Sequence, residues 1–184
     1  MARIKGIDIR KVGSGNIGAT NVFRCVGKFF GILTFALDFL KGYLPTALFP
    51  ILVQYAAKDV SIIHLSLLFG CLAIIGHNWP VWLNFKGGKG IATGAGVLLG
   101  VAPMAVLIGA LAWLISFVLT RYVSLASITS AMAIATSSWW LYRQNILIAF
   151  ILSLMCALAV WRHKANIRRL LNGTENRFAF GKKT

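Results

Sequence analysis

The 184-residue chain is 58% hydrophobic, has a mean hydropathy of +0.78, and carries 19 Lys and Arg against 4 Asp and Glu. A soluble domain of this length needs a far more polar surface, so the composition excludes an ordinary soluble protein and predicts an all-α, polytopic integral membrane protein. The formal net charge of +15 would also suit a nucleic acid partner. However, the basic residues gather beside apolar segments, which indicates membrane topology, and we expect no nucleic acid partner.

Residues 1–28 are basic and glycine-rich and lack the apolar segment of a signal peptide. Within them, residues 13–24 form a first polar segment, in which Asn16 can cap a helix. Thr20 and Arg24 would follow at i+4 and i+8, so a hydroxyl and a guanidinium would share one face beside the N–H groups of the helix start. That arrangement can bind an anion. A glycine-rich turn with an ordinary helix cap explains the same residues equally well.

Residues 29–57 are predicted to cross the membrane as one broken or irregular segment, because they include Asp38, Lys41 and Pro45. Asp38 and Lys41 are the charged residues within a span, and they can simply pair with each other. A sparse outer loop at residues 58–59 follows, and residues 60–76 return the chain to the inner side.

A second polar segment runs from Gly76-His77-Asn78-Trp79-Pro80 to Phe85-Lys86-Gly87-Gly88-Lys89-Gly90 and Ile91-Ala92-Thr93. Its consecutive glycines would let backbone N–H groups turn toward one oxyanion, with a positive charge from Lys89 and a helix start behind it. The segment lacks the Gly-x-x-x-x-Gly-Lys-Ser/Thr motif and a magnesium-binding Asp, so we do not expect nucleotide hydrolysis.

Residues 91–120 are too long for one upright span and too short for two, so we expect a short hairpin that turns near Gly100 and Pro103. Residues 122–142 and 145–161 complete about six membrane-embedded helices. Both termini and the middle loop are predicted to be cytoplasmic, because most basic residues lie there. The loop at residues 143–145 should then be external, and Arg121 should be internal. We expect one domain that spans residues 1–184.

The third polar segment, residues 161–175, places His163 and Asn166 at i and i+3 of a helix, with Gly173 in the position of a C-terminal cap. Cys25, Cys71 and Cys156 are far apart and have neither disulfide nor metal spacing, so we interpret them as ordinary small apolar residues and expect no metal site formed by them.

The three polar segments are predicted to lie on one side of the membrane, and they contain basic and amide side chains but almost no acidic ones. They therefore predict a site for phosphate-bearing substrates at the membrane surface. Spacing alone does not separate an enzyme from a membrane carrier for an organic phosphate or anion. A carrier would need polar residues deep within several helices and a site that opens to both sides. A non-catalytic lipid-binding scaffold would leave Ser14, His163 and Asn166 without a role.

The blocks GSGNIGATNVFR, GHNWPVWLNFKGGKGIAT, RYVSLAS and RHKANIRRLLNGTE resemble, in order and spacing, the bacterial acyl-phosphate:glycerol-3-phosphate acyltransferase family of the PlsY type. The resemblance covers nearly the whole chain. It implies transfer of a fatty acyl group from acyl phosphate to sn-glycerol 3-phosphate, which yields lysophosphatidic acid and phosphate as the first step of phospholipid biosynthesis. It further implies a bacterial inner membrane protein that uses no coenzyme A, no acyl carrier protein and no metal.

The resemblance also assigns roles to individual residues. The expected catalytic residues are Ser14, Arg24, Lys89, His163 and Asn166. The expected substrate-binding residues are Asn16, Thr20, Asn21, Gly87, Gly88, Gly90 and Ser124, and Glu175 is expected to be structural. His163 could accept the hydroxyl proton, or it could orient phosphate while the phosphate of the substrate accepts that proton.

Members of the family are similar to a seven-helix protein with an additional apolar helix before the first motif. Only a dozen residues precede Gly13 here. The resemblance therefore implies either that the natural start lies upstream or that this protein lacks that helix.

Overall fold

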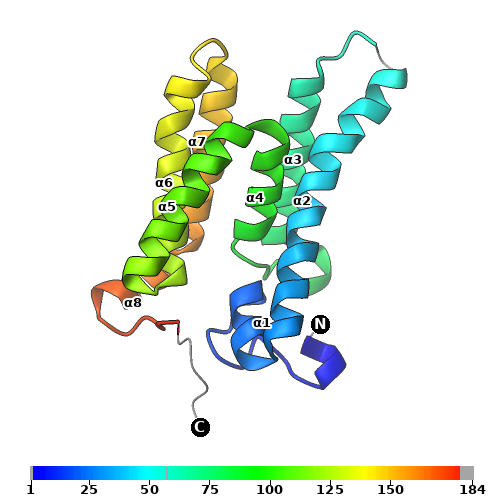
Figure 1. Cartoon of the computed structure of the whole chain (residues 1–184). Helices are drawn as coiled ribbons and strands as arrows, with labels where there is room; N and C mark the ends of the chain where they lie inside the picture. Colours follow the sequence, from blue (N-terminus) through cyan, green and yellow to red (C-terminus); the bar gives the residue numbers. More distant parts are fainter. Residues whose placement is uncertain (1, 57, 179–184) are drawn as a thin grey trace. The chain divides into compact units, whose positions relative to one another are not determined.

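The computed structural model describes residues 2–56 and 58–178, and within them the regular secondary structure is entirely helical. The chain divides into two compact units, Met1–Val101 and Ala102–Thr184 (Figure 1). The predicted all-α fold class is confirmed.

The first unit contains three apolar helices and several short ones. Its elements in chain order are the 3₁₀ helix η1 (Ala2–Lys5), α1 (Ala19–Cys25), α2 (Lys28–Ala56), α3 (Ile62–Asn78), the 3₁₀ helix η2 (Val81–Leu83) and α4 (Ile91–Val101).

Helix α2 runs without a break for 29 residues, although it contains Pro45 and Pro50. The prediction of a broken or irregular crossing is therefore wrong. Backbone groups in an apolar environment must be hydrogen-bonded within the segment, so keeping the rest of the helix intact is favoured despite the N–H groups that the two prolines lack. A helix of this length measures about 44 Å, which exceeds the thickness of the hydrocarbon core.

Small residues allow α2 and α4 to pack backbone against backbone. A Cβ atom added at Gly42 would lie 2.1 Å from the carbonyl oxygen of Thr93, and one added at Gly96 would lie 2.1 Å from that of Phe39. Gly96 and Gly100 also form the small-xxx-small spacing that favours close approach of membrane helices. These contacts fix the position of α4, and with it the polar segment that leads into it.

The polar segments of the first unit lie at one end of it. Helix α1 packs beside the start of α2, where Gly31 meets Phe23, and the loop from Trp79 to Gly90 follows the end of α3 at that same end (Figure 1). Residues 58–61 lie at the opposite end. This arrangement within the unit agrees with the predicted grouping of the first two polar segments.

The second unit contains α5 (Pro103–Thr120), α6 (Val123–Leu141), α7 (Ile146–Arg162) and α8 (Lys164–Leu171). Helical structure is interrupted at Ala102, between Gly100 and Pro103, where a turn is predicted. Pro103 is the first residue of α5. The backbone N–H of Phe178 donates to the carbonyl oxygen of Arg121, 2.8 Å away, so Phe178 lies at the α5–α6 turn. The turn at residues 142–145 lies at the opposite end of the unit (Figure 1).

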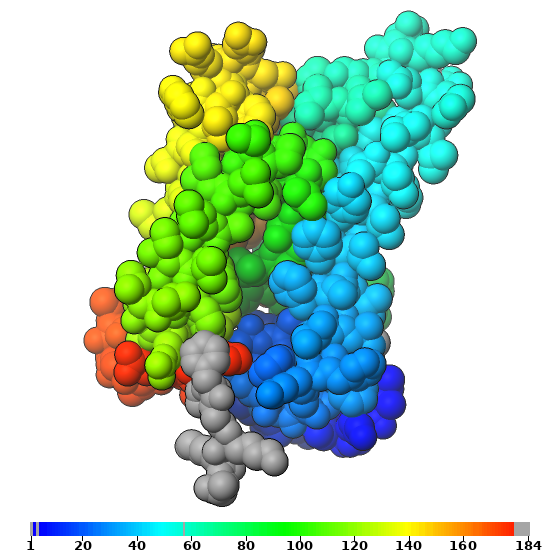
Figure 2. Space-filling model, viewed as in Figure 1, coloured from blue at the N-terminus to red at the C-terminus, as the bar shows by residue number. Residues whose placement is uncertain are grey.

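Among the described residues, three segments are long and apolar enough to cross a membrane: Lys28–Ala56, Ile62–Leu83 and Pro103–Thr120. Helices α7 and α8 pass the same test as one bent pair, and α4 is a shorter apolar helix. The outer faces of α2 and α5, visible in Figure 2, carry exposed apolar side chains such as Leu52, which is 64% exposed, and Val118, also 64% exposed. Such surfaces suit contact with lipid, and the count of about six embedded helices remains a prediction.

Candidate active site

Ser14 lies in an exposed loop, residues 9–18, which we name the serine loop. Gly13 and Gly15 on either side of it have φ values of 59° and 68°, a conformation that favours glycine. The backbone N–H of Ser14 donates to Oδ1 of Asn21, 2.9 Å away. The sequence Gly-Ser-Gly thus forms a tight turn that presents the serine at the surface.

Helix α1 begins at Ala19, and its N-cap residue is Gly18. The prediction that Asn16 caps this helix is wrong. The Asn16 side chain instead accepts a hydrogen bond from the N–H of Gly18, 2.8 Å away, because an asparagine readily closes a turn with the backbone two residues on. Thr20 and Arg24 do lie one helical turn apart on α1, as predicted, and Arg24 is exposed.

Asp38, Lys41 and His77 form a polar cluster in the first unit. The ammonium of Lys41 and the carboxylate of Asp38, three residues apart on α2, form an ion pair, as predicted. Nδ1 of His77, a buried residue at the end of α3, lies 3.7 Å from Oδ1 of Asp38. Sequence reasoning missed this second contact, although an acidic residue inside an apolar helix is a signal for a partner on a neighbouring helix.

The glycine loop, residues 87–90, folds back on the end of α3. The N–H groups of Gly87 and Gly88 donate to the carbonyl oxygens of Asn78 and His77, each 3.2 Å away. The prediction that these N–H groups turn toward an oxyanion is therefore wrong for this structure, because they complete the backbone of the adjacent helix end, where carbonyl groups lack helical partners.

Gly88 is buried against the His77 ring. A Cβ atom at this position would lie 2.0 Å from Nε2 of His77. Gly90, with a φ of 79°, turns the chain directly into α4, which starts at Ile91. Lys89 lies between these two glycines. The contact of Gly88 with His77 and the start of α4 after Gly90 therefore fix the backbone position of Lys89.

Glu175 is the centre of a polar cluster in the second unit. Its Oε1 accepts hydrogen bonds from the Ser124 hydroxyl at 2.9 Å and from Nδ2 of Asn166 at 2.8 Å, and its Oε2 accepts one from Nε of Arg169 at 2.7 Å. Burial raises the pKa of the carboxyl, but these three hydrogen bonds and the Arg169 charge outweigh burial and hold the pKa of Glu175 below its ordinary value. The glutamate stays ionised at neutral pH and ties α6 to α8.

His163 lies at the junction of α7 and α8, whose axes differ by 55°. His163 is the N-cap residue of α8 and Asn166 lies three residues after it, so the predicted i, i+3 spacing is present, whereas the bend at His163 was not predicted. Nδ1 of His163 lies 2.8 Å from the carbonyl oxygen of Ala159. A carbonyl oxygen can only accept a hydrogen bond, so this contact places the proton of a neutral ring on Nδ1 and leaves Nε2 as the acceptor nitrogen.

The end of α8 is capped as predicted. Gly173, with a φ of 68°, follows the last helical residues, and its N–H donates to the carbonyl oxygen of Leu170. The N–H of Thr174 donates to the carbonyl oxygen of Arg169, 2.8 Å away. This pair of hydrogen bonds is the Schellman motif, and it turns the chain so that Glu175 comes back toward α6.

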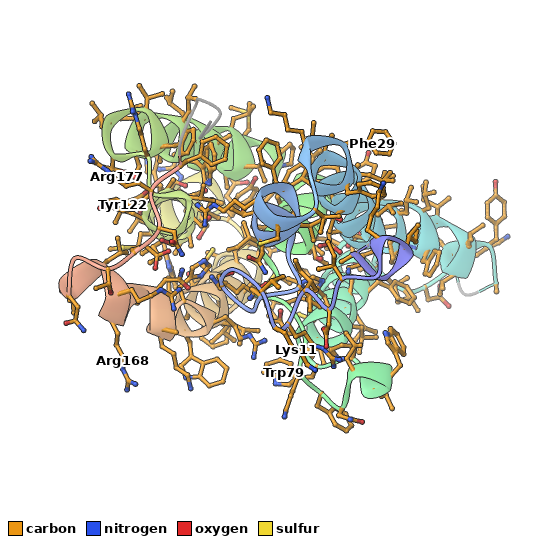
Figure 3. The ribbon with its side chains drawn as sticks, turned by 90° about the horizontal axis from the view of Figure 1, so that it is seen from below. Lys11, Phe29, Trp79, Tyr122, Arg168 and Arg177 are labelled. Atoms are coloured by element: carbon orange, nitrogen blue, oxygen red, sulfur yellow. The ribbon has the colours of Figure 1, made fainter. Side chains whose placement is uncertain are left out.

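Arg177 and Phe178 fix the chain to the α5–α6 turn, and sequence reasoning assigned no such contacts. The Arg177 guanidinium donates to the carbonyl oxygen of Thr120 and lies 5.4 Å from the centre of the Tyr122 ring. Figure 3 shows Arg177 beside Tyr122, whereas Arg168 points away from α8.

Across the residues that the structure describes, we find no cluster of three or more His, Cys, Asp or Glu that could hold a metal ion.

Comparison with known proteins decides the family. The family model described as glycerol-3-phosphate acyltransferase matches residues 1–173. A glycerol-3-phosphate acyltransferase of Aquifex aeolicus strain VF5 is 46% identical over 185 residues, which cover 97% of this chain and 89% of that protein. The chain belongs to the glycerol-3-phosphate acyltransferase family. A second relative in that family, from Desulforamulus reducens, is 46% identical over 181 residues, which cover 97% of this chain and 84% of the relative.

Two solved structures of the family are similar to this chain. One is PlsY (YgiH), an integral membrane glycerol 3-phosphate acyltransferase, in its glycerol 3-phosphate form; it is 43% identical with a TM-score of 0.84, and the match covers 97% of this chain and 86% of that one. The other is the lysophosphatidic acid form, with 42% identity, a TM-score of 0.81, and coverage of 97% and 85%. With its apolar helices, this member of the family is a membrane protein.

The acyltransferase residues predicted from the sequence fall into two sets. The first unit holds Ser14, Asn16, Thr20, Asn21, Arg24, Gly87, Gly88, Lys89 and Gly90 at one end. The second unit joins Ser124, Asn166 and Glu175 directly through hydrogen bonds, with His163 one helical turn before Asn166.

Proposed function

We propose that this chain transfers a fatty acyl group from acyl phosphate to the first hydroxyl of sn-glycerol 3-phosphate. The products are lysophosphatidic acid and inorganic phosphate, and the reaction begins phospholipid biosynthesis. The likeness to PlsY in forms named for glycerol 3-phosphate and lysophosphatidic acid carries this proposal, because those two molecules are the acceptor and the product.

In the proposed reaction, the hydroxyl oxygen of glycerol 3-phosphate attacks the acyl carbonyl carbon. The new ester bond forms as the bond between that carbon and the phosphate oxygen breaks, and phosphate leaves. Positive charge from Arg24 and Lys89 stabilises the phosphates and the charge that develops at the carbonyl oxygen. Ser14 and Asn166 orient the reacting groups, and Asn16, Thr20 and Ser124 complete the binding of substrate.

The hydroxyl proton must pass to an acceptor as the ester forms. The contact of His163 Nδ1 with the Ala159 carbonyl supports His163 as that acceptor, since it makes Nε2 the basic nitrogen of the neutral ring. The alternative acceptor is the phosphate of the substrate. A His163→Ala variant tests whether His163 takes part in either way: loss of the base, or of a group that orients phosphate, lowers kcat about 100-fold or more, whereas loss of a bystander leaves kcat unchanged.

We propose further that the whole chain acts as one acyltransferase domain in the bacterial cytoplasmic membrane, with the reaction at the cytoplasmic side. Exposed basic residues support this orientation, since Lys11 and Arg24 belong to the polar end of the first unit and Lys164 and Arg168 belong to that of the second.

The proposal is tested by the choice of acyl donor. Purified protein is supplied with glycerol 3-phosphate and either palmitoyl phosphate or palmitoyl-coenzyme A, in the presence of a chelator. We expect turnover with palmitoyl phosphate alone, without acyl carrier protein or metal. Equal or faster turnover with the thioester would place the protein in another class of acyltransferase, and turnover that stops in chelator would show a need for metal.

A further inference from the structure

Asn21 is a buried amide in the middle of the first polar segment, with only 3% of its surface exposed. The resemblance of this segment to the family suggests that Asn21 binds substrate. Its position in α1 instead places it beneath the serine loop, where its side chain contacts backbone on both sides of Ser14.

Both polar atoms of the Asn21 side chain are used within the protein. Its Oδ1 accepts hydrogen bonds from the Ser14 N–H at 2.9 Å and from the Cys25 thiol at 3.6 Å. Its Nδ2 donates to the carbonyl oxygens of Ile9 at 3.2 Å, Val12 at 3.1 Å and Asn16 at 2.9 Å. An amide has two N–H donors and two acceptor lone pairs, so these contacts account for its whole capacity. Little remains with which to hold a substrate phosphate.

The hydrogen bonds of Asn21 reach residues on both sides of Ser14 in the sequence. Val12 lies two residues before the serine and Asn16 two residues after it, and the Ser14 N–H itself is bound. The loop passes so close to the amide that a Cβ atom at Gly13 would lie 2.3 Å from Oδ1 of Asn21. Because a rigid framework determines where an exposed loop residue points, this single side chain sets the position of the serine.

We infer that Asn21 is a positioning residue: it acts on the reaction through Ser14, by holding the serine loop, and does not touch the substrate. This inference rests on the proposed function only in that Ser14 takes part in acyl transfer. Removal of the amide frees the loop, and displacement of a catalytic group by about 1 Å can cost on the order of 100-fold in rate.

The test is a double-mutant cycle between Asn21→Ala and Ser14→Ala, measured as kcat and KM with palmitoyl phosphate and glycerol 3-phosphate. We expect Asn21→Ala to lower kcat about 100-fold with little change in either KM. In the Ser14→Ala background, the same change should lower kcat by less than about threefold, since there is no serine left to position. Asn172→Ala, an exposed amide that follows α8, serves as the matched control and should keep the activity of the unmodified protein.

Asn21→Asp provides a second variant of the same size. A carboxylate at this position still accepts the Ser14 N–H but cannot donate to three carbonyl oxygens, so we expect a loss of kcat as large as that of Asn21→Ala. Wild-type kcat in either variant would overturn the inference. So would a loss that is equally large with and without Ser14, since it would show that Asn21 acts independently of the serine.

Hydrogen exchange of the unmodified protein tests the same contact without any substitution. The Ser14 amide should exchange at least about tenfold more slowly than an unprotected loop amide, although Ser14 is exposed. Exchange at the unprotected rate would contradict the hydrogen bond on which the inference depends. This measurement also separates the two proposals, because an unmodified protein without transferase activity would refute the proposed function even if the Ser14 amide were protected.

Discussion

Gly88→Ala tests how the glycine loop holds its shape. The added methyl would lie 2.0 Å from Nε2 and 2.8 Å from Cε1 of the His77 ring, well inside van der Waals contact. The ring is buried and lies near Asp38, so it cannot swing freely out of the way. Overpacking of this kind typically costs about 1 to 3 kcal/mol, which the loop can relieve by moving away from α3 and carrying Lys89 with it.

The expected result is a raised KM for glycerol 3-phosphate with a smaller effect on kcat, because loss of a binding interaction that is equal in the ground state and the transition state appears in KM. If the loop takes up about 1.4 kcal/mol of the strain as lost binding, the KM rises about tenfold. Initial rates over a range of glycerol 3-phosphate concentrations, at saturating palmitoyl phosphate, measure both constants.

Gly94→Ala is the matched control, since Gly94 lies in α4 and a Cβ atom there would meet nothing within 4 Å. Alanine in a helix interior is favoured over glycine by about 0.5 to 1 kcal/mol, so this variant should bind substrate normally and be slightly more stable. An unchanged KM in Gly88→Ala would refute the reasoning from the His77 contact. An equal rise in both variants would show that α4, and not the contact with His77, determines the effect.

Three further predictions concern the stability of the folded protein at acidic pH, its orientation in the membrane and the acceptor of the hydroxyl proton. Because the pKa of Glu175 is lowered in the folded protein, its ionised carboxylate stabilises the fold above the ordinary titration range of a glutamate, and this contribution is lost as the pH falls through the lowered pKa. Below about pH 4, the Tm of the unmodified protein should therefore drop more steeply than the Tm of Glu175→Gln. Parallel Tm curves of the two proteins in detergent would contradict this prediction. Reporters fused after Lys183, which lies outside the described residues, and within residues 77–90 should both report a cytoplasmic position, and an external signal from either would reverse the assigned orientation. His163→Ala should lower kcat about 100-fold, whereas Lys58→Ala, in the loop between α2 and α3, should have no effect. Equal activities would remove His163 from the reaction.

Features that depend on nearby residues could be predicted from the sequence. The structure confirms three such features: the interruption of helical structure next to Pro103, the cap at Gly173, and the pairing of Asp38 with Lys41. Each of them depends on residues that lie close together in the sequence. The family and its fold could also be predicted, because the polar motifs recur in a fixed order along the chain.

Features that depend on contacts between distant residues could not be predicted. Nothing near His77 in the sequence shows that Asp38 lies beside it, or that the N–H groups of Gly87 and Gly88 are taken up by the end of α3. The helix break at His163 could not be predicted either, because the residues around it have good helical spacing. The bend depends on distant contacts, since Asn166 on α8 donates a hydrogen bond to Glu175. In these cases tertiary contacts determine a conformation that local preferences leave open.

Acyl transfer from a phosphate donor is tested most directly by following both products in one reaction. Purified protein, palmitoyl phosphate and radiolabelled glycerol 3-phosphate are combined, and lysophosphatidic acid and inorganic phosphate are measured over time. We predict that the two products appear in equal amounts and that phosphate release stops when glycerol 3-phosphate is omitted. Phosphate release without lysophosphatidic acid, or no turnover by inserted and folded protein, would contradict the account.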